Sequence, residues 1–172
     1  IAMGLKGSEA AKEAAVLVLA DDNFATIVEA VREGRTVYDN LIKVISWTLP
    51  TSAGASAVVV LALLAGFALP VTAVQILWIN LITGITLGLA LAFEPTEAGT
   101  MARPPRPRNA PILSGELLWR VVLVSLLFLA AVFGVFAYAL DKGHSLALAQ
   151  TMAMNTLVVL EIFNLFFIRN LY

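Results

Sequence analysis

The chain has 172 residues, of which 60% are hydrophobic and 13% are charged, and its mean hydropathy is +0.89. This composition excludes an ordinary soluble domain, in which about a quarter of the residues are charged. The absence of cysteine excludes disulfides and thiolate metal sites. The net charge of -1 says little about partners, and we expect no nucleic acid among them.

The first 43 residues carry twelve of the 23 charged side chains and therefore belong to water. "IAMG" (1–4) and "VLVLA" (16–20) are typical of short buried strands, and Ser8 is a suitable N-cap for a helix between them. "DDNFATIVEAVREGR" (21–35) begins at an aspartate cap and places its apolar residues on one helical face. The order strand, helix, strand, helix predicts the closing edge of an α/β domain, and we expect most of that domain to lie upstream.

Two long segments without Asp, Glu, Lys, Arg or His, 44–93 and 121–140, are suited to a bilayer. A membrane-spanning helix needs about 20 apolar residues, so the first segment is long enough for two spans, with Pro70 at the turn between them. A further span near the C-terminus is interrupted only by Glu161. The sequence therefore predicts a mainly α, polytopic bundle with four spans, at 44–67, 71–93, 118–140 and 146–168.

The remaining segments complete the predicted order. Residues 1–34 form the α/β edge, and 35–43 form a stalk in which its second helix runs into the first span. Gly34 is the expected position of a hinge or a break in that helix. Residues 94–117 form a loop that includes the extended "MARPPRPRNAP", and 169–172 follow the last span.

Basic residues predict the orientation of the spans. Four arginines cluster between the second and third spans: Arg103, Arg106, Arg108 and Arg120. The positive-inside rule places this loop, and both chain ends, in the cytoplasm. From the Ala- and Leu-rich composition we expect an integral protein of a bacterial plasma membrane.

Several polar groups lie within the predicted spans. An ionised carboxylate such as Glu161 deep in a span costs about 3 kcal/mol, so it should face a cavity or a partner, or be protonated. An ion or proton role and a structural hydrogen bond between helices are both open. Asn80 and Thr83 are three residues apart and share a helical face, where they either bind an ion or connect helices. Gly84 and Gly88 either allow close helix packing or loosen the helix so that its carbonyls bind a cation.

The first span adds a stripe of hydroxyl groups at i,i+4 spacing, formed by Thr48, Ser52 and Ser56. Packing and contact with an ion are both compatible with such a stripe. Trp47 is expected to be a packing residue. Oxygen ligands of this kind suit hard cations such as Na⁺, K⁺, Mg²⁺ or Ca²⁺ rather than soft metals.

Three sequence segments resemble a known family. "IAMG.KGSE..KEAA..VLADDNFATIV.AV.EGR.VYDN..K.I" resembles the end of the phosphorylation domain and the stalk of P-type cation-transporting ATPases of the calcium, sodium/potassium and proton class. "VQILWINLIT" with "LALAFEP", and the "M.RPPR" loop, resemble the sixth membrane helix of that family and the cytoplasmic loop after it. The resemblance covers the whole chain and identifies the four spans as the fifth to eighth membrane helices.

The resemblance implies where the chemistry of such a pump takes place. In the full-length protein, ATP phosphorylates an aspartate in a D-K-T-G motif with the help of Mg²⁺, and domain movements pull the stalk to give alternating access. That motif and the nucleotide-binding domain are absent from this sequence. We therefore expect no catalytic residue in this chain, and its expected partners are the transported cation, the lipid bilayer and the missing N-terminal parts of the pump.

The resemblance also implies a cation site formed by Asn80, Thr83, Glu161 and Ser52. Asn80 and Thr83 match the Asn and Thr of the sixth-helix motif, and Glu161 matches the eighth-helix Glu of calcium pumps. The acidic residue that follows the Thr in the family is Gly84 here. On the fifth helix, Ser52 and Ala55 stand where calcium-type pumps carry Asn and Glu.

Two functions from different classes follow from these observations. The first is the membrane part of an ATP-driven pump that translocates a cation whose identity the sequence leaves open: a single site, a monovalent ion and a larger organic cation are all compatible with the lost carboxylates. The second is a non-catalytic membrane scaffold or regulatory remnant of such a pump. An intact D-K-T-G motif upstream in the same reading frame would favour the pump.

Overall fold

A computed structural model gives the structure of the protein and describes residues 1–107 and 114–169. The described chain forms two compact units. The first unit contains Ile1–Tyr38 and Pro95–Pro105, and the second contains Asp39–Glu94 and the described part of 106–172. Arg108 and the predicted end segment after residue 169 lie outside the described residues.

The first unit contains a two-stranded parallel sheet. Strand β1 (Ala2–Met3) pairs with β2 (Val18–Leu19), and helix α1 (Glu9–Ala14) connects them. The Ser8 side chain caps α1 by accepting a hydrogen bond from the backbone N–H of Ala11. The predicted order of strand, helix, strand and helix is confirmed, because helix α2 follows β2.

The start of α2 (Ala25–Leu64) differs from the expected simple aspartate cap. Asn23 accepts a hydrogen bond from the backbone N–H of Ala25, and the Asp21 carboxylate accepts one from the backbone N–H of Asn23. Asp22 instead has a positive φ of 54° and accepts hydrogen bonds from the backbone N–H groups of Leu5 and Lys6. It fixes the turn after β1 rather than the helix.

Helix α2 has 40 residues and belongs to both units. It runs through Gly34 as one helix, so a break at this position is absent from the structure. A single glycine lowers helix propensity by only about 1 kcal/mol, which the rest of a long helix outweighs. The helix also contains Pro50, which has no N–H to donate to the carbonyl of Ser46.

Helix α2 ends at Leu64, three residues before the predicted end of the first span. Gly66 adopts a left-handed conformation with φ of 69°, and the Phe67 N–H donates to the carbonyl of Ala62, which together close the helix. Helix α3 (Ala73–Ala92) starts with a capping box between Thr72 and Gln75.

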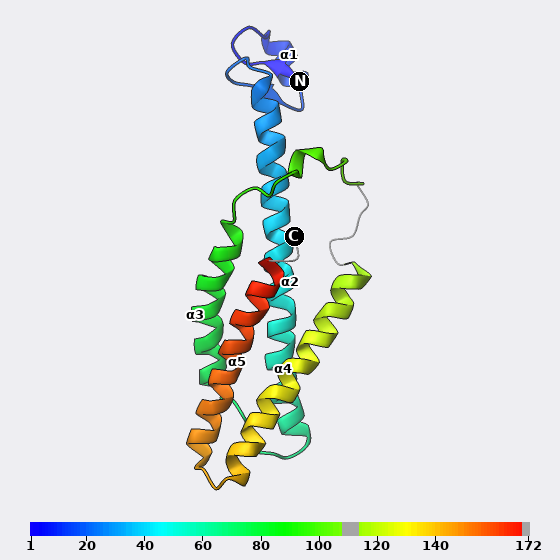
Figure 1. Ribbon diagram of the computed structural model, residues 1–172. Helices are drawn as coiled ribbons and strands as arrows, with labels where there is room; N and C mark the ends of the chain where they lie inside the picture. The colour runs from blue at the N-terminus through cyan, green and yellow to red at the C-terminus, as the bar shows by residue number, and fades with distance from the viewer. Residues whose placement is uncertain (108–113, 170–172) are drawn as a thin grey trace. The chain divides into compact units, whose positions relative to one another are not determined.

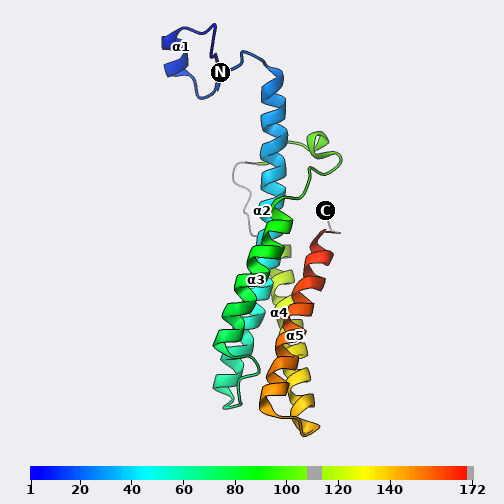
Figure 2. The same cartoon turned by 90° about the vertical axis from the view of Figure 1, so that its left-hand side faces the viewer.

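Helices α4 (Gly115–Asp141) and α5 (Leu146–Arg169) lie side by side as a hairpin (Figures 1 and 2). The apolar core of the second unit is formed by buried residues of all four of its helices and of the turn between α2 and α3: Ala55, Val58, Val71, Ile79, Phe128, Val132, Phe136, Ala139, Ala149, Ala153 and Leu157. By length and composition, α2 to α5 are able to cross a membrane, which confirms the predicted mainly helical class with four candidate spans.

Candidate functional site

A polar cavity of about 160 Å³ lies between α2, α3 and α5. Its wall is formed by Trp47, Thr48, Thr51, Ser52, Asn80, Thr83, Gly84 and Glu161. The structure therefore brings together the four residues that the sequence analysis selected, Ser52, Asn80, Thr83 and Glu161. Ser56 of the predicted hydroxyl stripe does not reach this cavity and lines a larger neighbouring groove of about 500 Å³.

Glu161 is the acidic residue of this cavity and is only 2% exposed. Among the described residues, no group forms a hydrogen bond with its Oε2 atom. A buried carboxylate oxygen without a partner is costly, because it has lost its contacts with water and gained nothing in return. A cation, a proton or an ordered water molecule would supply the partner that Oε2 of Glu161 lacks.

The α3 wall contributes two neutral oxygen groups. Thr83 is buried and donates its hydroxyl hydrogen to the carbonyl of Ile79, at 2.8 Å. This bond within the helix leaves lone pairs of the Thr83 oxygen available as acceptors. Asn80 lies one turn earlier on the same face and lines both the cavity and the larger groove.

Helix α3 is a regular α-helix at both of its glycines, Gly84 and Gly88. A Cβ atom built on Gly84 or Gly88 would meet no atom of the described residues within 4 Å, so neither glycine serves close packing there. The backbone is regular α-helix through both positions, so its carbonyls are not freed by unwinding. Gly84 leaves open space in the cavity wall instead.

Trp47 connects α2 to α5 beside the cavity. It is 3% exposed, as expected for a packing residue, but its indole Nε1–H also donates to the backbone oxygen of Glu161, at 3.1 Å. One turn further along α2, the Thr51 hydroxyl bonds to backbone carbonyls of its own helix. The indole therefore holds α5 against α2 at the position of the carboxylate.

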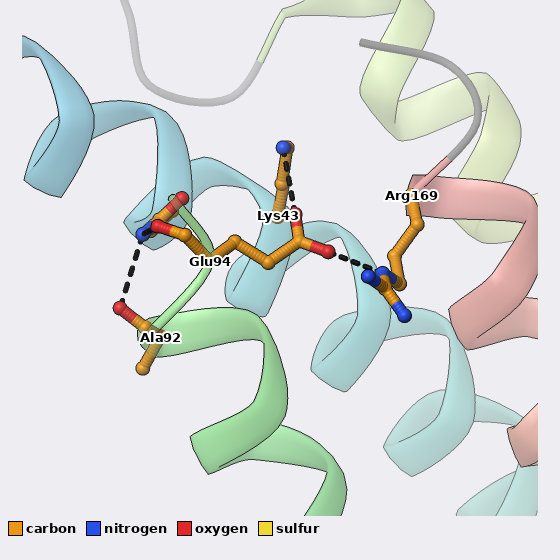
Figure 3. Close-up of polar contacts among 5 residues, drawn as sticks. Lys43, Ala92, Glu94 and Arg169 are labelled. Carbon is orange, nitrogen blue, oxygen red and sulfur yellow. Dashed lines mark hydrogen bonds and ion pairs between the residues drawn. The ribbon is translucent and has the colours of Figure 1, made fainter. Parts of the chain in front are cut away.

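A second polar cluster was not found by reasoning from the sequence (Figure 3). The buried Nζ of Lys43 on α2 lies 2.8 Å from Oε2 of Glu94, which follows the end of α3. Nε of Arg169, the last residue of α5, donates to the other carboxylate oxygen of Glu94. The sequence did contain a signal for the Lys43–Glu94 ion pair. The two residues flank the charge-free segment 44–93, which forms a helical hairpin, and the two ends of a hairpin lie close together.

The same region receives two further hydrogen bonds from α2. The Asn40 side-chain amide donates to the backbone oxygens of Ala92 and Glu94, at 3.0 and 2.9 Å. Burial raises the pKa of Glu94, but hydrogen bonds from Lys43 and Arg169 outweigh burial and hold this pKa below its ordinary value. The carboxylate is therefore ionised at neutral pH.

Comparison with known proteins identifies the family to which this chain is similar. The family model described as "Cation transporting ATPase, C-terminus" matches residues 68–172. The chain is 54% identical over 171 residues to "Probable cation-transporting ATPase F" of Mycobacterium tuberculosis, a match that covers 99% of this chain and 19% of that protein. It is 43% identical to "Cation-transporting ATPase pma1" of Synechocystis, with the same two coverages.

A third relative carries a more specific name. "Calcium-transporting ATPase" of Bacillus subtilis is 38% identical over 167 residues, which cover 96% of this chain and 19% of that protein. The chain thus spans about a fifth of the length of the curated relatives it matches.

Proposed function

We propose, because the chain belongs to the cation-transporting ATPase family, that it is the membrane part of an ATP-driven P-type pump that moves a cation across a membrane. The observation that supports this most directly is Glu161, a buried carboxylate whose Oε2 has no partner among the described residues and which lines a polar cavity. A structural carboxylate would have both oxygens satisfied by neighbouring groups.

The cation site consists of Glu161 together with Asn80, Thr83 and Ser52 in this proposal. One carboxylate and three neutral oxygen groups form a ligand set for a hard cation. The apolar helices around the cavity keep the local dielectric low, which strengthens the attraction between the carboxylate and a cation. The identity of the cation stays open.

The ATP-dependent chemistry takes place outside this chain. The sequence contains no D-K-T-G motif, and its described residues contain no cluster of three or more His, Cys, Asp or Glu side chains able to hold a metal ion. We assign 1–34 to the end of the phosphorylation domain and 35–43 to the stalk. ATP and Mg²⁺ belong to the remainder of the pump.

Helix α2 provides the mechanical connection in this mechanism. It begins in the first unit and continues without a break to Ser52 and beyond. In the proposed mechanism, a movement of the phosphorylation domain reaches the cavity through this continuous helix. The protein is an integral membrane protein, and we place it in a bacterial plasma membrane with the arginine-rich loop in the cytoplasm.

The test is the ATPase activity of the purified full-length pump with Na⁺, K⁺, Ca²⁺, Mn²⁺ and polyamines, each in the presence of Mg²⁺. We expect one cation to stimulate activity, and Glu161→Gln to raise the concentration needed for half-maximal activation by at least about tenfold, as loss of a charged ligand does. Glu116→Gln is the matched control, because Glu116 is exposed. Absence of stimulation by every cation would contradict the pump and favour a membrane scaffold.

A further inference from the structure

The cluster of Lys43, Glu94 and Arg169, called the ionic bracket below, joins the three helices that line the polar cavity. Lys43 precedes Ser52 of the cavity by nine residues on α2, and Arg169 follows Glu161 by eight residues on α5. Glu94 follows Thr83 by eleven residues, just after the end of α3. At about 1.5 Å per residue, the bracket lies roughly 12–17 Å from the cavity along all three helices.

The bracket is largely buried, unlike an ion pair on the protein surface. The side chains of Lys43 and Glu94 are 4% and 9% exposed, and that of Arg169 is half exposed. Removing one member of a buried pair leaves an uncompensated charge, which costs far more than an exposed pair ever contributes. Intermediate positions of the three helix ends are therefore unfavourable, and the bracket defines one arrangement of them.

We propose that Glu94 is a positioning residue for cation binding: by holding Lys43 and Arg169 together, it fixes the ends of α2, α3 and α5 and thereby the spacing of the cavity walls. This inference rests on the proposed function. Among the described residues, the hydrogen bonds between Glu94 and other side chains involve Asn40, Lys43 and Arg169, none of which lines the cavity, so its proposed action is through the helices. The Trp47 indole also links α2 to α5, and the Asn40 amide also links α2 to the end of α3. The spacing that depends most on the Glu94 side chain is therefore that between the ends of α3 and α5.

The first test compares cation activation of the full-length pump with that of Glu94→Gln, which keeps the size of the side chain and removes its charge. With the stimulating cation, we expect the half-activating concentration to rise about five- to tenfold, while the maximal rate changes less than twofold. A residue with a merely structural role would lower thermal stability and leave the half-activating concentration unchanged. That result would overturn the proposal.

Reversing the charges provides a rescue. The triple variant Lys43→Glu, Glu94→Lys, Arg169→Glu restores two opposite-charge contacts with inverted polarity. We expect its half-activating concentration to return to within about threefold of the wild type, since the double contact is what positions the helices. Glu116→Gln, which removes one negative charge at an exposed side chain, is the control and should leave the activation curve unchanged.

A measurement without any cation separates this inference from the proposed function. Thr51 lines the cavity and is 4% exposed, so a cysteine introduced by Thr51→Cys into an otherwise cysteine-free full-length pump should react slowly with a small thiol reagent. Adding Glu94→Gln should accelerate this reaction at least about threefold, because the walls are no longer held. An unchanged rate would overturn the positioning role even if no cation stimulates the pump.

Discussion

The two buried carboxylates of the second unit, Glu94 and Glu161, have opposite surroundings. Glu94 is held by an ammonium and a guanidinium group, and both of its oxygens are paired. Glu161 is more deeply buried, yet its Oε2 has no partner among the described residues. The comparison teaches that burial alone does not define a role: the satisfied carboxylate of Glu94 joins three helices, whereas the unsatisfied one of Glu161 is the ligand in the proposed cation site.

The largest expected effect comes from replacing one of the two positively charged side chains of the ionic bracket. Lys43→Met should lower the free energy of unfolding by about 3 kcal/mol, because it leaves the buried Glu94 with only the half-exposed Arg169. Thermal or denaturant unfolding of the full-length pump in detergent measures the change. Lys142→Met, at an exposed loop, is the control, and equal stability of the two variants would show that the bracket does not stabilise the fold.

Substitution of the other buried carboxylate, Glu161, should affect the response to the cation rather than stability. Glu161→Gln should not lower the thermal midpoint, because it removes a charge that lacks a full set of partners. It should abolish the rise in midpoint that the transported cation produces in the wild type, a stabilisation of about 2–3 kcal/mol at a concentration near 100 times Kd. A variant that is destabilised and still responds to the cation would show that Glu161 is structural.

The pH dependence of stability sharpens the role of Glu94. Its pKa lies below the ordinary value of 4.5, so its contribution to stability is complete above that pH and is lost as the pH falls through the lowered pKa. The thermal midpoint of the wild type should therefore fall more steeply below about pH 4.5 than that of Glu94→Gln. If the thermal midpoints of the two proteins fell in parallel with pH, the Glu94 carboxylate would not be stabilised by Lys43 and Arg169 in the folded protein.

The smallest expected effect concerns a neutral ligand of the cavity. Asn80→Ala should raise the half-activating cation concentration about threefold, since a neutral oxygen contributes less than the Glu161 carboxylate. Measuring Asn80→Ala and Glu161→Gln on the same preparation ranks the two groups. An effect of Asn80→Ala larger than that of Glu161→Gln would move the centre of the site to α3.

Much of this architecture could be predicted from local sequence. The long apolar segments predicted the four candidate membrane helices, because a span needs about 20 mainly apolar residues and tolerates a single charged one such as Glu161. The four candidate ligands could be selected because a polar group in such a segment requires a reason, and the resemblance to pumps supplied one. The bounds of the helices were less accurate: α2 ends at Leu64 because Gly66 takes a left-handed conformation, a choice that depends on the following turn.

The contacts between distant residues could not be predicted. The bracket joins Lys43 to a residue 51 positions later, and Trp47 reaches one 114 positions later. No periodicity encodes such pairs, which depend on how the helices pack. The two glycines of α3 show the same limit, because a G-x-x-x-G spacing predicts packing only if a neighbouring helix lies against it.

The open space at Gly84 has a consequence for how such proteins diversify. A side chain at this position would point into unoccupied volume rather than into packed atoms of the described chain. Exchange of this glycine for a carboxylate would therefore change the formal charge of the cavity by one unit, and the Cβ atom of the new side chain would meet no atom of the described residues within 4 Å. In the proposed site, the charge of the cavity is thus separable from the fold, because it can change at this position while the helices around it stay the same.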